Sequence, residues 1–142
     1  MRGVLISVAA LTLSACGSQG GSQPAPSADA TAAGPQTYFT TEIAPILMTN
    51  CATCHQTGAE WGNISLLPAN AIAMTVNVAA IEAPKMMRIV PGMPDESYLI
   101  MKLEGTHVPH GGSGSQMPFG APPLSPDKIA KFRTWITDGA KP

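Results

Sequence analysis

The most constraining feature of this sequence is a pair of cysteines followed at once by a histidine, Cys51-Ala52-Thr53-Cys54-His55. Residues three positions apart lie on the same side of a helical turn, so both thiols can bind one group. Three kinds of site use such a pair. A pair with an adjacent histidine is typical of covalent haem attachment, whereas a bare pair occurs in thioredoxin-like dithiols and as half of a zinc site.

The rest of the sequence favours haem attachment over the other two sites. A thioredoxin-like pair requires a strand–helix–strand context, and none is predicted around the motif. A zinc site requires two further cysteines or histidines, and only His107 and His110 remain, far away in a glycine-rich stretch. Aromatic residues make up only 5% of the chain, so a buried macrocycle would supply core volume. We expect one covalent haem c, with thioethers from Cys51 and Cys54 and His55 as the proximal iron ligand.

The first residues have the features of an export signal. Arg2 precedes an apolar run over residues 4–13, which is shorter than the roughly 20 residues that span a bilayer as a helix. The run ends in Leu13-Ser14-Ala15-Cys16, which resembles the lipobox of bacterial lipoproteins. We expect residues 1–15 to be a lipoprotein signal peptide and Cys16 to carry a lipid anchor on the periplasmic side of the outer or inner membrane. The alternative is an ordinary signal peptide with an incidental cysteine.

Residues 16–36 form the expected linker between the lipidated cysteine and the domain. The stretch consists mainly of Gly, Ser, Gln, Pro, Ala and Thr, and Asp29 is its only charged residue. Such a composition cannot bury a core, and about 20 residues of flexible coil span roughly 25 Å. We expect residues 37–142 to form a single domain.

Apolar residues recur at helical spacing in four segments of this domain, and no segment shows sustained period-two alternation. The expected helices cover residues 38–50, 68–76 and 95–103, and a last helix follows Ser125. In the first helix, Pro45 is expected to cause a kink or to start a new first turn. Gly105 is expected to stop the third helix, and Gly139 is expected at the end of the last. The fold class predicted from this pattern is all-α.

The formal net charge of the chain is −1, and the sequence contains no basic run. Nucleic-acid binding therefore has no electrostatic basis here. Strong electrostatic steering toward a highly charged partner is also not expected.

Several segments beyond the haem motif resemble one known family. They are Ile89-Val90-Pro91-Gly92, Ser97-Tyr98-Leu99, Met117-Pro118 and Trp135-Ile136-Thr137-Asp138-Gly139-Ala140. With the haem motif, they make residues 38–140 similar to a class I cytochrome c of a bacterial branch. The resemblance implies a class I cytochrome c fold, a single small all-α domain around one covalent haem. It also implies crossing first and last helices, with Phe39 and Trp135 near the contact.

The distal iron ligand decides between an electron carrier and a catalyst. A methionine thioether is soft, favours ferrous iron and closes the sixth position to small molecules. We expect Met117, because it precedes Pro118 and follows a flexible Gly-Ser loop, as in the family. Met93, which also precedes a proline, and His107 or His110 are the alternatives. For the two histidines the simpler interpretation is that they are solvated loop residues.

The expected function is extracytoplasmic one-electron transfer by a haem c with His/Met ligation. The chain would then be an electron carrier and not an enzyme, exchanging electrons with redox partner proteins or serving as a module of an exported oxidoreductase. The alternative is a haem-based sensor or a peroxidase-like enzyme with an open or displaceable distal position. Such a site needs a polar group for acid–base chemistry, which His107 or His110 would supply.

Overall fold

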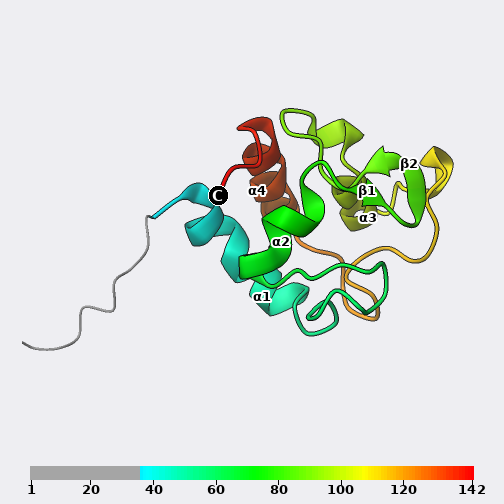
Figure 1. Cartoon of the computed structure of the whole chain (residues 1–142), viewed down its shortest axis with the longest axis horizontal. Coiled ribbons are helices and arrows are strands. Elements are labelled where there is room, and N and C mark those ends of the chain that lie inside the picture. The colour runs from blue at the N-terminus through cyan, green and yellow to red at the C-terminus, as the bar shows by residue number, and fades with distance from the viewer. Residues whose placement is uncertain (1–35) are drawn as a thin grey trace, which may run out of the picture. The chain divides into compact units, whose positions relative to one another are not determined.

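The computed structural model describes residues 36–142, which belong to one compact unit. The expected signal peptide, Cys16 and all but the last residue of the expected linker lie outside the described residues. The elements in chain order are η1 (a π-helix, Phe39–Ile43), α1 (Ala44–Asn50), α2 (Pro68–Thr75), β1 (Ala79–Ala80), β2 (Ala83–Met87), η2 (3₁₀, Pro94–Glu96), α3 (Tyr98–Glu104), η3 (3₁₀, Val108–His110) and α4 (Pro126–Thr137) (Figure 1). Within this range, no helix is apolar and long enough to span a bilayer.

The helix expected over residues 38–50 is present in two parts. The amide of Ala44 donates to the carbonyl of Phe39, the five-residue spacing of a π-turn, and α1 follows directly. Pro45 lies in the first turn of α1, where its missing N–H would have no partner within the helix in any case. The prediction that Pro45 starts a new first turn is confirmed.

The other three expected helices are also present, with one internal break. The segment predicted over residues 95–103 is divided into η2 and α3 by Ser97, whose backbone is extended. The Ser97 hydroxyl donates to the carbonyl of Met93 and accepts from the amide of Val90, both at 2.9 Å, and this bonding stabilises the break. Gly105 ends α3 in the left-handed region at φ 75°, as predicted.

A small antiparallel hairpin, β1–β2, adds strand structure that the sequence pattern did not indicate. Ala79 pairs with Met87 and Ala80 pairs with Ala83, with an irregular register between the two pairs. A two-residue strand is too short to show alternation, and alanine is not a strand former. The regular structure of the domain is therefore mostly helix, with one hairpin beside α3.

The core joins the first and last helices of the domain. The rings of Phe39 and Trp135 have centroids 5.4 Å apart at an interplanar angle of 41°, so the expected contact between them is confirmed. The Trp135 indole N–H also donates to the carbonyl of Lys141 at 2.7 Å. Other buried members of this cluster are Ile43, Ile46, Leu47, Leu66, Ala71, Ile89, Ile100, Leu103, Leu124, Phe132, Ile136 and Ala140.

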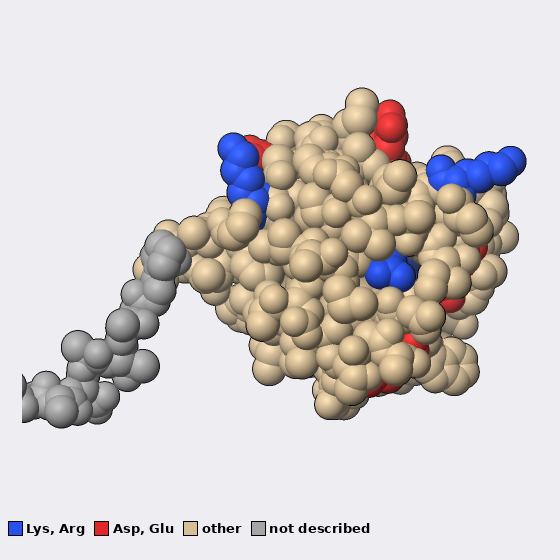
Figure 2. Space-filling model, in the orientation of Figure 1, with Lys and Arg blue, Asp and Glu red and all other residues tan. Residues whose placement is uncertain are grey.

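Ion pairs fasten the surface of α4 to its neighbours. Arg133 pairs with Asp95 at 2.6 Å and with Glu104 at 2.9 Å, and Lys131 pairs with Glu42 at 2.6 Å. The face drawn in Figure 2 carries few charged side chains. Such exposed pairs each contribute about 0–1 kcal/mol, so they orient α4 more than they stabilise it.

Candidate functional site

The cysteine–histidine motif occupies a hydrogen-bonded turn at the end of α1. The amides of Cys51 and Ala52 both donate to the carbonyl of Leu47 at 2.9 Å. The carbonyl of Cys51 then accepts from the amides of both Cys54 and His55 at 3.1 Å. The local sequence therefore places both cysteines on one turn, as their spacing predicts.

Both cysteines of the motif are unpaired, and they differ in exposure. Cys51 is half-buried and packs against the core, whereas Cys54 is exposed. Burial, and next the nearby Cys54, raise the pKa of the Cys51 thiol to about 11, against the opposing influence of Lys128. A dithiol redox pair needs a lowered thiol pKa, so this environment does not suit a thioredoxin-like site.

The imidazole of His55 has the properties of a neutral metal ligand. Its backbone is held by a hydrogen bond from the amide of Leu66 to the carbonyl of His55 at 2.8 Å. Burial lowers the pKa of the ring, although Glu60 and Glu82 act in the opposite direction. Nδ1 is buried and has no hydrogen-bond partner among the described residues, and the same holds for Nδ1 of His107. A neutral imidazole is the form that binds metals.

The residues that follow the motif are held in place by hydrogen bonds to a carboxylate. The carboxylate of Glu60 accepts from the amides of Thr57 and Gly58 at 2.9 Å and from the Thr57 hydroxyl at 2.9 Å. These bonds, those from Thr57 first, lower the pKa of Glu60 to about 2. The residues directly after His55 are therefore held in a defined turn.

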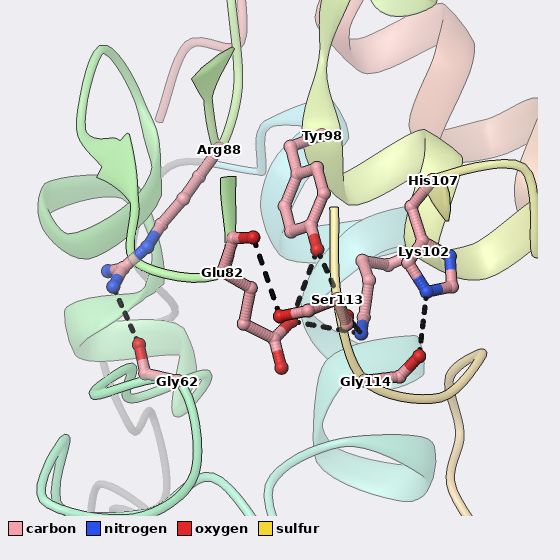
Figure 3. A network of polar contacts seen from close by, with 8 residues as sticks. All are labelled: Gly62, Glu82, Arg88, Tyr98, Lys102, His107, Ser113 and Gly114. Atoms are coloured by element: carbon pink, nitrogen blue, oxygen red, sulfur yellow. Dashed lines mark hydrogen bonds and ion pairs between the residues drawn. The ribbon is translucent and has the colours of Figure 1, made fainter. Parts of the chain in front are cut away.

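A guanidinium holds the next part of the same loop. Arg88 is only 7% exposed, and it donates to the carbonyl of Gly62 at 2.7 Å (Figure 3). It also donates to the carbonyls of Met74 at 2.7 Å and of Asn63 at 3.1 Å. All three of these partners are neutral carbonyls, so the contribution of Arg88 here is to fix the path of the loop against α2.

Of the two methionines that precede a proline, Met117 is the one that faces the protein. It is half-buried and packs against the main core cluster, as Cys51 does. Its amide donates to the carbonyl of Lys102 in α3 at 2.9 Å. Met93 is 48% exposed. This difference favours Met117 over Met93 as a ligand inside the domain.

The two histidines of the glycine-rich segment have different environments. His110 is exposed, in line with a solvated loop residue. The same expectation is wrong for His107, which is 2% exposed because its ring packs edge-on against Tyr98 and its Nε2 bonds the carbonyl of Gly114 at 3.0 Å. His110 also borders a surface cavity of about 420 Å³ beside β2 and α3, and no residue of the haem motif lines that cavity.

A buried polar network beside the Met117 loop was not anticipated (Figure 3). Lys102 is 5% exposed and forms an ion pair with Glu82 at 2.9 Å. Its ammonium also donates to the carbonyl of Ser113 at 2.9 Å, and the Tyr98 hydroxyl donates to Glu82 at 3.2 Å. The sequence feature that could have indicated this network is a lysine inside an apolar helical segment, Ile100-Met101-Lys102-Leu103.

Comparison with known proteins yields no match, whether to a family model, to a curated protein or to a solved structure.

The residues brought together by the turn fit a covalent haem better than a protein-bound metal ion. Within residues 36–142, no three side chains of the types His, Cys, Asp and Glu form a group that could hold a metal ion, as a zinc site would require. A haem requires less from the chain, namely two unpaired thiols, one neutral imidazole and one further axial donor. Cys51, Cys54 and His55 meet the first two requirements, and the Met117 thioether is a candidate for the third.

Proposed function

We propose that this chain is a one-electron carrier of the class I cytochrome c type. It would hold one haem c through thioethers from Cys51 and Cys54, with His55 and Met117 as axial ligands. The observation that carries the proposal is the hydrogen-bonded turn at the end of α1, which brings together two unpaired cysteines and the histidine that follows them.

The bound haem would supply an iron that changes oxidation state by one electron. The chain's own residues would tune and shield it. His55, kept neutral by burial, has a lone pair for the metal, and the bond from Leu66 fixes its backbone. Met117 offers a soft thioether, which favours the reduced state and raises the potential.

The structure gives less support to a catalytic or sensing role. Such a role needs a polar side chain that is free to approach a distal ligand. The Nε2 of His107 is engaged by Gly114, and His110 is exposed beside a different cavity. We therefore prefer the carrier, with redox proteins as its partners and no substrate of its own.

Localisation is part of the same proposal. A lipid on Cys16 would hold the chain on the periplasmic side of a bacterial membrane, and residues 16–36 would let the domain reach its partners. The proposal also accounts for all three cysteines of the chain, since it assigns one to the lipid anchor and two to the haem.

The test is whether matured protein carries haem by covalent bonds. Acid–acetone extraction should leave the colour on the chain, and the intact mass should exceed that of the polypeptide by one haem. Cys51→Ala should leave little stable holoprotein. Haem that passes into the organic layer from correctly matured wild type would refute covalent attachment. Optical and EPR spectra of the ferric protein would then report both axial ligands and separate a closed from an open iron.

A further inference from the structure

We propose that Lys102 is a positioning residue for the distal ligand, which it acts on by fastening the loop that carries Met117 to α3. This inference rests on the proposed function, because it concerns the ligand assigned there. It goes further in assigning a role to an ion pair between buried Lys102 and half-buried Glu82, which is proposed neither to bind the haem nor to belong to the motif.

The ammonium of Lys102 lies at the centre of a set of contacts from three separate segments (Figure 3). Glu82, from the turn between β1 and β2, pairs with it at 2.9 Å. The carbonyl of Ser113, in the glycine-rich loop, accepts from it at 2.9 Å. The ring of Tyr98, one turn earlier in α3, lies 5.9 Å from it. The lysine thus joins the hairpin and the loop to the helix.

Lys102 holds the loop at two points, one through its side chain and one through its backbone. The ammonium bonds the carbonyl of Ser113, while the carbonyl of Lys102 accepts from the amide of Met117 at 2.9 Å. Between these points, the side chain of Gln116 donates to the carbonyl of Leu103 at 2.8 Å. The last carbonyls of α3 are therefore satisfied by the loop, and the loop cannot slide along the helix without breaking several bonds.

The glycines of the loop allow it to approach α3 and the hairpin closely. The loop is therefore packed against its neighbours, whereas its composition indicates a flexible connection. A Cβ atom at Gly112 would lie 2.6 Å from Cε2 of Tyr98. A Cβ atom at Gly114 would lie 2.7 Å from a carboxylate oxygen of Glu82 and 3.2 Å from the Lys102 ammonium. At Gly112 an added side chain would meet the Tyr98 ring and the His107 backbone, and at Gly114 it would displace the ends of the Glu82 and Lys102 side chains. His107 holds the opposite side of the loop through its bond to Gly114.

A buried ammonium is a costly means of stabilising a helix. Its desolvation offsets much of the attraction to Glu82, and an apolar side chain of similar length is often equally stable at such a position. What an apolar residue cannot do is bond the Ser113 carbonyl. The network is thus better suited to specifying where the loop lies than to adding stability.

The decisive variant is Lys102→Met, which keeps the length of the side chain and removes the ammonium. In the haem-loaded protein we expect Met117 to detach more often. Imidazole should bind the ferric form about tenfold faster, the effect of losing one charge-assisted hydrogen bond, and amide exchange at Met117 should accelerate similarly. The charge-transfer band of the methionine-ligated ferric haem should weaken and the reduction potential should fall. Lys131→Met, which breaks the exposed pair with Glu42, is the matched control and should change none of these.

Two glycine variants test the positioning role of Lys102 without removing a charge. They replace Lys102→Met as the test if that variant does not fold. Gly112→Ala places a methyl group against Tyr98, whereas at Gly111, with φ at 83°, an added Cβ meets nothing within 4 Å. Gly112→Ala should accelerate imidazole binding, and Gly111→Ala, which adds only backbone strain, should not.

The possible failures are distinguishable. If Lys102→Met and Gly112→Ala bind imidazole at the wild-type rate with Met117 still ligated, the positioning role is wrong and the carrier stands. If wild-type protein has no covalent haem or no methionine ligand, the proposed function itself fails, and the positioning role fails with it.

Discussion

The amide of Met117 donates a hydrogen bond to the carbonyl of Lys102 across 2.9 Å, and this bond involves no atom of the methionine side chain. The backbone at this residue therefore has an anchor that does not depend on the thioether, in addition to the packing of the side chain against the core. As a result, removing the side chain should test ligation and leave the loop in place.

Met117→Ala should keep the covalent haem, because Cys51, Cys54 and His55 are unchanged. Without the thioether, the ferric iron should shift toward high spin or bind water, hydroxide or another side chain. We expect the reduction potential to fall by on the order of 0.1–0.3 V, within the roughly 0.8 V range that axial ligands control. Carbon monoxide should bind the reduced variant readily and the wild type poorly.

Met93→Ala is the control for this experiment, because Met93 also precedes a proline but is 48% exposed. It should leave the spectrum and the potential unchanged. The reverse pattern would move the ligand to Met93 and keep the carrier. Fast and complete binding of carbon monoxide by wild-type ferrous protein would instead favour a sensor or an enzyme.

Arg88→Met should destabilise the domain, because three carbonyls of the loop after the motif and of α2 lose their donor. The expected loss is about 2–4 kcal/mol in the free energy of unfolding, measured by urea titration with circular dichroism. Arg88→Lys keeps the charge without the planar fork of donors and should lose less. Lys85→Met, at an exposed cation of β2, should change little. Equal urea midpoints for Arg88→Met and wild type would show that these bonds contribute nothing.

The phenol of Tyr98 should impose an alkaline limit on stability. Burial, and next the charge of Glu82, raise its pKa to about 12 from an ordinary value of 10.0. Since the folded state holds this proton more tightly than the unfolded state, the contribution is fully present below pH 10 and is lost as the pH rises from 10 toward 12. Carbon-13 NMR of labelled tyrosine rings would follow the titration, with Tyr38→Phe to assign the signals. Titration of Tyr98 near pH 10 would contradict this environment.

Cys16→Ser should release the protein from membranes or stall its processing. The wild type should partition into detergent, because two or more acyl chains hold a protein firmly at the bilayer. Mass spectrometry of the mature N-terminus provides a second measurement. A first residue other than Cys16 would mean that Leu13-Ser14-Ala15-Cys16 is not a lipobox.

The helix α4 could be predicted from sequence because its determinants are local. Ser125 precedes it, Pro126 opens it, and Gly139 follows it at φ 97°. The Ser125 side chain nevertheless makes no capping bond, so its position was predictable and its bonding was not. The hairpin escaped prediction because one of its strands has only two residues.

The residues of the candidate site also differ in how far they could be predicted from local sequence. Cys51, Cys54 and His55 are adjacent in sequence, so their common turn follows from spacing alone. The environment of Lys102 depends on Glu82 and Ser113, which come from segments far from it in the chain. Sequence pattern and composition contain no information on contacts between distant segments. For this reason the glycines of the loop indicated flexibility, whereas the structure shows close packing there.

The contact between Phe39 and Trp135 has a consequence for the order of events during synthesis. Phe39 is made early and Trp135 late, so a nascent chain exposes the apolar side of η1 to water until α4 has emerged. Folding that depends on contacts between distant segments is slow to begin. We expect the domain to fold only after α4 has been made, when residues 1–15 have long been synthesised. If residues 1–15 act as the proposed export signal, placing the two halves of the core at opposite ends of the domain would give export time to begin before folding competes with it.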